Sequence, residues 1–134
     1  MQQQPQRHTH KELAGKIRQA LEAFDNQRID FAEPTHVDAD IDELHLADEE
    51  EYLDLIYECL QLAQEDPLET FRPPNPPKST KHALTKNLPM WAFEVQHESY
   101  PFNLYFKFCL KEHRDGTLYC HIDCHESRPK NHNT

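Results

Sequence analysis

Three segments in the second half of the chain alternate apolar and polar residues with a period of two. They are "PMWAFEVQ" (89–96), "YPFNLYFKFCLK" (100–111) and "GTLYCHIDCHE" (116–126). Successive side chains of a β-strand point to opposite faces, so the pattern predicts three strands, each with one buried face. Asp115-Gly116 supplies a turn between the last two. The segments therefore predict an antiparallel meander whose apolar face packs on other elements.

The first half shows the apolar spacing of helices. Apolar residues between Leu13 and Phe24 form one stripe, and Thr9 followed by Glu12 has the pattern of a capping box. These features predict a helix that begins near Thr9 and ends near Asp25.

A second long helix is predicted over about 49–65. Asp48 and Glu51 repeat the capping pattern, and the acidic run suits a helix N-terminus, where the dipole favours negative charge. Between the two helices, residues 27–47 are acidic and irregular and favour only a short helical turn around 41–46. Five prolines between 66 and 77 predict an extended crossover.

These patterns predict one α+β domain, with two N-terminal helices packed on one face of a three- to four-stranded antiparallel sheet. The length of 134 residues suits one domain. The expected divisions are a disordered lead (1–8), a helical part (9–66), a proline-rich crossover (67–80), a sheet part (88–127) and a flexible tail (128–134).

Composition places this domain among cytoplasmic proteins. Mean hydropathy is −0.93, no apolar run approaches the ~18 residues of a membrane span, and "MQQQPQRHTH" lacks the apolar core of a secretory signal. The cytosol is reducing, so we expect Cys59, Cys109, Cys120 and Cys124 to be free thiols. The only glycines are Gly15 and Gly116; without a phosphate-cradling loop, kinase, NTPase and dinucleotide-binding roles are excluded and no cofactor is expected.

The net charge of −10 is unevenly distributed. Residues 1–66 carry 17 acidic and 5 basic side chains, a net charge of −12, whereas residues 67–134 carry 7 and 9, a net charge of +2. An acidic protein is not an obvious nucleic-acid binder. The division nevertheless allows an acidic face and a neutral-to-basic working face.

The segment from Cys120 to His125 contains two cysteines and two histidines, which resembles a zinc motif in composition. In a strand, residues four apart are separated by roughly 13 Å, while zinc ligands lie ~2.0–2.3 Å from the metal. The segment therefore predicts no metal site. Alternation instead places Cys120 and Cys124 inward with Leu118 and Ile122.

The same alternation predicts a polar outward face on the last two strands. It comprises Tyr105, Lys107, Tyr119, His121, Asp123 and His125, with Glu94 on the strand before. Such a face can be a solvated surface, or it can be a general acid–base site, because histidine exchanges protons near neutral pH and lysine or tyrosine can stabilise a phosphate.

A basic stretch after the crossover prolines favours the second interpretation. Lys78, Lys81, His82 and Lys86 can be a solvated loop, or they can hold the RNA backbone beside an acid–base face. Metal-independent RNA cleavage needs one group that removes the 2′-OH proton, another that protonates the 5′-oxygen, and cations that hold the phosphate. The predicted catalytic residues are Lys78, Tyr105, Lys107, His121 and His125; the predicted substrate-binding residues are Lys81, His82, Lys86 and Tyr119.

The order of these features resembles the RelE superfamily of small bacterial toxins, and the MqsR-type toxins most. The resemblance lies in two helices before a three-stranded antiparallel sheet, in Lys78-Ser79, "MWAFEV", "LYFKF" (104–108) and "HIDCHE" (121–126), and covers roughly residues 40–127. It implies an mRNA endoribonuclease neutralised by an antitoxin, with Lys78, Tyr105 and His125 on catalytic positions. The acidic charge, the stretch around 30–51 and the proline crossover depart from the family pattern.

Three hypotheses therefore remain open from the sequence. The first is a metal-independent endoribonuclease of toxin type with an antitoxin partner. The second is an acidic protein-binding module of immunity, antitoxin or nuclease-inhibitor type, whose −12 segment covers a basic partner. The third is a structural protein with an inert sheet face.

Overall fold

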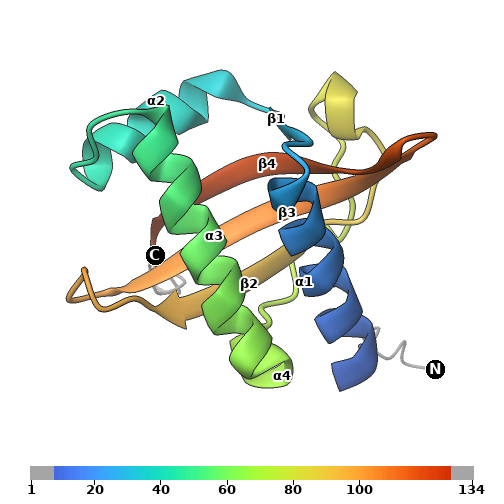
Figure 1. The fold of residues 1–134 in the computed structure, drawn as a ribbon, viewed down its shortest axis with the longest axis horizontal. Coiled ribbons are helices and arrows are strands. Elements are labelled where there is room, and N and C mark those ends of the chain that lie inside the picture. The colour runs from blue at the N-terminus through green and yellow to red at the C-terminus, as the bar shows by residue number, and fades with distance from the viewer. Residues whose placement is uncertain (1–7, 128–134) are drawn as a thin grey trace.

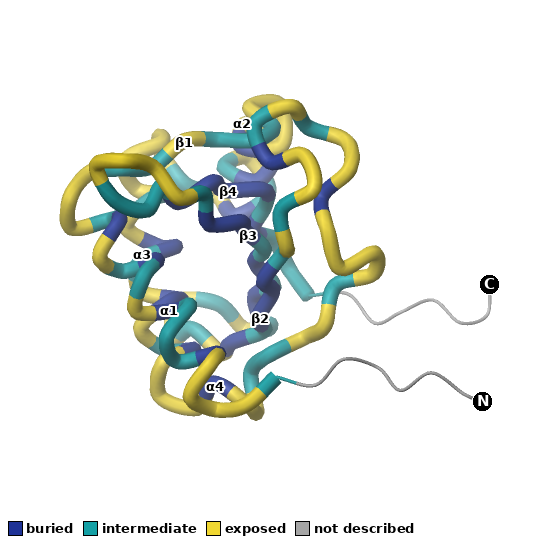
Figure 2. The backbone as a smooth tube through the Cα atoms, turned by 90° about the vertical axis from the view of Figure 1, so that its right-hand side faces the viewer, coloured by how far each residue is buried: buried dark blue, intermediate teal, exposed yellow. Residues whose placement is uncertain are grey.

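Three layers make up the structure, a computed structural model that describes residues 8–127. Helices α1 (His10–Asp25), α2 (Pro34–Glu43), α3 (Glu49–Glu65) and α4 (Pro67–Thr70) form the first layer, and a four-stranded sheet forms the second. The predicted crossover of 67–80 begins with α4, and the extended segment of residues 71–90, which we call the crossover from here on, forms the third layer on the far side of the sheet (Figures 1 and 2). The predicted α+β class, with helices on one side of the sheet, is confirmed. The predicted terminal segments, residue 8 excepted, lie outside the described residues.

The two long helices begin and end where their sequences predict. Thr9 caps α1, its Oγ1 accepting from the Glu12 backbone N–H at 3.0 Å. Asp48 caps α3 in the same way, its Oδ1 accepting from the Glu51 N–H at 3.0 Å. Glu51 also accepts from the Ala47 N–H at 2.9 Å, so backbone donors that the helix leaves unpaired at this end are satisfied by side chains.

Strands β2 (Trp91–Gln96), β3 (Asn103–His113) and β4 (Gly116–Glu126) form the predicted antiparallel meander. The sheet order is β1-β4-β3-β2, and the short edge strand β1 (Ile29–Phe31) pairs in parallel with β4. The sheet is therefore mixed, not wholly antiparallel as predicted. A three-residue strand is too short to show an alternation pattern in the sequence.

Helix α2 is longer than the predicted turn, and its carboxylates close part of the β4 edge that β1 leaves uncovered. Asp40 Oδ2 accepts from the Cys124 N–H at 2.8 Å, and Glu43 Oε2 accepts from the Glu126 N–H at 3.0 Å. On the opposite edge, the Arg72 N–H donates to the Ala92 carbonyl at 2.9 Å. Since open strand edges invite pairing with other chains, these contacts keep the sheet closed at both sides.

The main hydrophobic core lies between the helices and the inner face of the sheet, which we define as the face toward the helices. Its largest wholly buried residues include Tyr52, Phe93, Phe106, Phe108 and Tyr119. The rings of Phe93, Phe106 and Phe108 stack with centroids 5.8 to 6.2 Å apart. Burying one such side chain contributes roughly 1.5–3 kcal/mol, so this ladder fixes the register of β2 and β3.

The crossover covers part of the outer face of the sheet. It folds back on itself through a bridge between Lys78 and Pro89 and includes a 3₁₀ turn, Ala83–Thr85. Leu84, Leu88 and Met90 pack over a second, smaller cluster built on Cys109, Cys120 and Ile122. The part of the outer face around Cys109 and Cys120 is therefore shielded from solvent. Within residues 8–127 no helix combines the length and apolarity that a membrane span requires.

Candidate functional site

A β-bulge divides β4 into two halves that expose opposite residue sets. Lys107 pairs with Asp123 while the next residue, Phe108, pairs with His121, so Ile122 is an extra residue in the ladder. A bulge of this kind shifts the alternation by one position. Residues before and after Ile122 therefore do not follow one continuous alternation, and the sequence prediction holds only for the half from Asp123 onward.

The prediction that Tyr119 and His121 point outward is wrong. Both side chains are 0% exposed and lie in the main interior with α3. His121 belongs to a buried chain of hydrogen bonds: its Nε2 lies 2.7 Å from the Tyr52 hydroxyl and its Nδ1 lies 3.1 Å from the Tyr119 hydroxyl. In this conformation neither His121 nor Tyr119 can touch a substrate.

The donor and acceptor of each hydrogen bond in this buried series follow from Asp40, the carboxylate at its end. The Tyr52 hydroxyl donates to Asp40 Oδ2 at 2.7 Å, so it must accept from His121, whose Nε2 carries the hydrogen. Nδ1 of His121 is then the acceptor of the Tyr119 hydroxyl. Burial lowers the pKa of His121 to about 3, which keeps the ring neutral. Burial raises the pKa of Asp40, while hydrogen bonds from Cys124 and Tyr52 act in the opposite direction.

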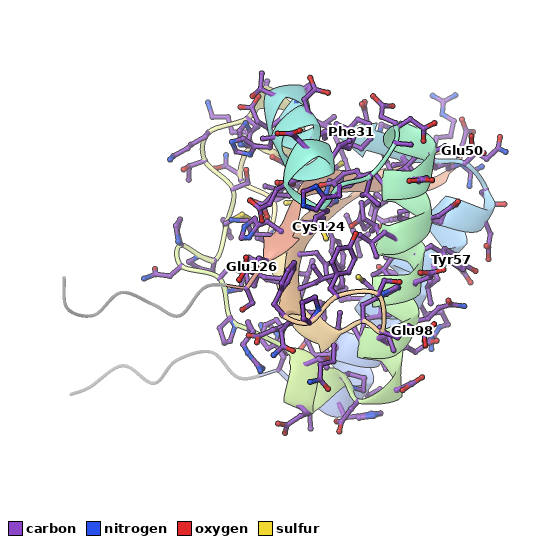
Figure 3. All side chains as sticks on the ribbon, turned by 90° about the vertical axis from the view of Figure 1, so that its left-hand side faces the viewer. Phe31, Glu50, Tyr57, Glu98, Cys124 and Glu126 are labelled. Atoms are coloured by element: carbon purple, nitrogen blue, oxygen red, sulfur yellow. The ribbon has the colours of Figure 1, made fainter. Side chains whose placement is uncertain are left out.

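The four cysteines are free and buried, as predicted for thiols, but Cys120 does not point where the sequence indicated. The bulge places Cys120 on the outer face, directly opposite Cys109, beneath the crossover. Cys124 lies on the inner face (Figure 3), where the neighbouring Cys59 and burial raise the pKa of its thiol. Over the described residues no group of histidine, cysteine and carboxylate side chains is arranged to hold a metal ion.

Four titratable side chains remain together on the outer face, and we call them the outer row: Tyr105, Lys107, Asp123 and His125. Tyr105 pairs with His125 and Lys107 with Asp123, at alternate register positions of β3 and β4, so the two pairs are neighbours on one face. The Tyr105 and His125 rings lie 5.6 Å apart, and His125 Nε2 lies 4.0 Å from Asp123 Oδ1. All four side chains are half-buried.

The protonation states within the outer row are set by its surroundings. Burial, and then the nearby Asp123 carboxylate, raise the pKa of Tyr105 to about 12, so its hydroxyl is a proton donor at neutral pH. His125 Nδ1 lies 2.9 Å from the Glu126 carbonyl oxygen. In a neutral ring Nδ1 carries the hydrogen of that contact, and Nε2 carries the basic lone pair.

Glu94 extends this surface onto β2, beside Tyr105. It accepts from Asn103 Nδ2 at 2.8 Å and pairs with Arg72 Nε at 3.2 Å. Burial alone would raise the pKa of Glu94, but the hydrogen bond from Asn103 and the charge of Arg72 outweigh it and lower the pKa. Arg72 and Asn103 carried no signal in the sequence, since their contacts with Glu94 depend on the pairing of β2 with β3 and on the backbone bond from Arg72 to Ala92.

The predicted basic stretch lies on the crossover, where Lys78 forms a bridge with Pro89. Lys78, Lys81 and Lys86 are exposed. His82 Nδ1 instead lies 3.6 Å from Glu33 Oε2, next to the start of α2. The structure thus brings three of the five predicted catalytic residues together, Tyr105, Lys107 and His125, and buries His121. The convergence of Lys78 with the three stays a prediction.

Asp40 is the residue of this region that the sequence analysis missed. Val37, Asp40 and Leu44 are all buried, at spacings of three and four along α2. A carboxylate in the apolar stripe of a short helix was therefore the signal, since a buried acid requires hydrogen-bond donors.

No protein-family model, curated protein or solved structure matches this chain. Membership of the RelE superfamily therefore stays a prediction, based on the order of elements and the short motifs.

Proposed function

We propose that this chain is a toxin-type endoribonuclease that cleaves RNA at the outer row and is controlled by a protein partner. The observation that carries the proposal is the adjacency of Tyr105, Lys107, Asp123 and His125 on two paired strands. A proton acceptor, a proton donor and a fixed cation are the groups that cleavage by the neighbouring 2′-OH requires. These side chains stand on strands, which hold catalytic groups more rigidly than loops.

Each side chain has a role in the proposed reaction. Nε2 of His125 removes the 2′-OH proton, and the 2′-oxygen forms a bond to phosphorus as the bond from phosphorus to the 5′-oxygen breaks. The Tyr105 hydroxyl gives its proton to the departing 5′-oxygen. Lys107 stabilises the negative charge that develops on the phosphoryl oxygens. The products are a 2′,3′-cyclic phosphate and a 5′-hydroxyl.

Incubation of the purified protein with end-labelled single-stranded RNA tests the proposal under two conditions, in EDTA without ribosomes and in magnesium buffer with ribosomes. We expect cyclic-phosphate products, and His125→Ala and Lys107→Ala should each slow cleavage by about 100-fold, within the range for a lost acid–base or charged group. The exposed residues of α1 supply matched controls, His10→Ala and Lys11→Ala, which should cleave like the wild type. Absence of cleavage under both conditions, or equal rates in all five proteins, would refute the proposal.

A second candidate function is that of an acidic protein-binding module without catalysis. The observation that favours it is the clustering of charge: α2 and α3 carry a series of exposed carboxylates, among them Asp38, Asp42, Glu50 and Asp54. A surface of one sign steers association with a surface of the opposite sign. This function predicts a salt-sensitive complex with a basic protein and no growth arrest on expression.

A further inference from the structure

A groove of about 300 Å³, lined by apolar and polar side chains together, lies on the helical side between the end of α1 and the first half of α3. The half-buried side chains of Phe24, Ile29, Leu53 and Tyr57 line it. The rings of Phe24 and Tyr57 lie 5.8 Å apart. The groove therefore offers aromatic and aliphatic surface to a partner, at a place where the core residues beneath are already packed.

The edge of this groove is acidic. Glu50 and Asp54 line it from α3, and Asp25 accepts from the Tyr57 hydroxyl at 3.1 Å. Figure 3 shows Glu50 and Tyr57 extending from the same side of α3. No basic side chain is among the residues that line the groove within residues 8–127.

The two α3 carboxylates contribute little to the fold beyond the favourable position of Glu50 in the first turn of the helix. Neither Glu50 nor Asp54 has an ion-pair partner in the part of the chain that the structure describes. Like charges four residues apart on a helix destabilise it by roughly 0.2–0.5 kcal/mol. The helix dipole offsets this for Glu50 in the first turn, but Asp54 lies beyond that turn.

We propose that this groove docks a basic segment of a protein partner, with an apolar side chain on the groove floor and lysine or arginine residues against Glu50 and Asp54. The occupant follows from complementarity: the floor requires an apolar group, and the unpaired carboxylates require cations beside it. The inference rests on the second candidate function and names its binding site. It does not involve the outer row, which lies on the opposite face of the sheet.

A fluorescent synthetic peptide of repeated Leu-Lys-Lys-Leu units is the probe, with fluorescence anisotropy as the measurement. We expect binding that Glu50→Gln with Asp54→Asn weakens by about fivefold or more, through loss of two charges. Leu53→Ser should weaken it as well, through loss of floor contact. A peptide with glutamate in place of lysine should not bind.

The matched control is Glu22→Gln with Glu65→Gln, which removes the same charge from exposed positions of α1 and α3 outside the groove. This variant should bind within about twofold of the wild type. Amide NMR shifts on peptide addition should map to residues around Phe24, Ile29 and Leu53. Equal weakening by both charge pairs would leave a general acidic binding surface but eliminate the groove, and absence of binding would eliminate both. RNA cleavage is measured separately and is unaffected by either result.

Discussion

Four buried polar side chains at the centre of the molecule form one hydrogen-bond network, in which the donor or acceptor role of each depends on its neighbours. His121 donates to Tyr52 and accepts from Tyr119, and Tyr52 donates to Asp40. Each group has its partner, so the desolvation that each suffered is compensated. Removal of one side chain leaves its neighbours without a hydrogen-bond partner in a site that water cannot enter. The free energy lost is then larger than the net contribution of the hydrogen bond itself, so a single substitution should have a measurable effect on stability.

Replacement of Tyr52 by phenylalanine should destabilise the fold by about 1–3 kcal/mol, because His121 loses its acceptor and Asp40 loses a donor. Urea denaturation measures this. The matched control lies on the same helix: the Tyr57 hydroxyl also donates to an aspartate, but at an exposed position. Tyr57→Phe should change stability by less than about 0.5 kcal/mol. Equal costs for the two variants would show that the buried hydroxyl has no structural role.

His121 should also make stability depend on pH. Its pKa is about 3 in the folded protein and about 6.5 in the unfolded chain, so below pH 6.5 only the unfolded state gains the proton. Stability is then fully present above pH 6.5 and is lost as the pH falls toward 3. From pH 7 to pH 5 this residue should account for a loss of about 2 kcal/mol. The raised pKa of Asp40 acts oppositely at the acid end, because the folded carboxyl takes up a proton more readily.

Urea denaturation of the wild type and His121→Gln at both pH values isolates this contribution, since the other histidines are common to both. The wild type should lose about 2 kcal/mol more than the variant over this range. If the variant does not fold, the ring resonances of His121 in the wild type decide, and they should remain those of a neutral imidazole at pH 5. Protonation of His121 in the folded protein at that pH would contradict the expectation.

At the scale of elements, the sequence predicted those helices and strands whose limits depend on residues near one another in the chain. The caps Thr9 and Asp48 set the starts of α1 and α3, and uninterrupted alternation set β2 and β3. The bulge at Ile122 was not predictable, because an extra residue in β4 is defined only by its pairing with β3. That one residue reversed the faces of Cys120 and His121, and with them half of the candidate site.

The turn between β3 and β4 and the first helix contain the chain's two glycines, and these should respond oppositely to alanine. Gly116 has φ +129°, and a Cβ there would lie 2.5 Å from Arg28 Nη1. Gly116→Ala should therefore cost about 1–3 kcal/mol in backbone strain. Gly15 lies within α1, where a Cβ meets only Arg18 Nη2 at 3.8 Å, so Gly15→Ala should stabilise by about 0.5–1 kcal/mol. Thermal unfolding measures both, and shifts of the same sign would refute the assignment.

At the scale of the whole molecule, the sheet separates two environments with different stability. The inner side has long helices over a continuous core, whereas the outer side has an extended crossover over a small cluster. The crossover makes few apolar contacts and contains no long helix or strand. Its local opening should therefore require less free energy than opening of the main core. The charge follows this division for α3, whose exposed carboxylates such as Glu50 and Asp54 lie on the helical side, whereas α2 reaches the edge of β4 beside the outer row.

The cysteines are distributed over both environments and can report on each. Cys59 and Cys124 lie in the main core, and Cys109 and Cys120 lie under the crossover. Burial raises the pKa of Cys109 to about 12 and that of Cys120 to about 11, so neither thiol reacts while covered, because the thiolate is the nucleophile. A thiol can therefore react only after the structure around it opens. Local opening of the crossover is enough for Cys109 and Cys120, whereas Cys59 and Cys124 require global unfolding.

Labelling of the native protein with iodoacetamide, followed by peptide mass spectrometry, should consequently show two classes of thiol. Cys109 and Cys120 should react first, through opening of the crossover, and Cys59 and Cys124 should react at the rate set by global unfolding. Addition of low urea should accelerate the second pair more steeply, because global unfolding exposes more surface. Fully unfolded protein, in which all four thiols should label alike, is the control. One common rate for all four in the native protein would mean that the crossover and the main core open as a single unit.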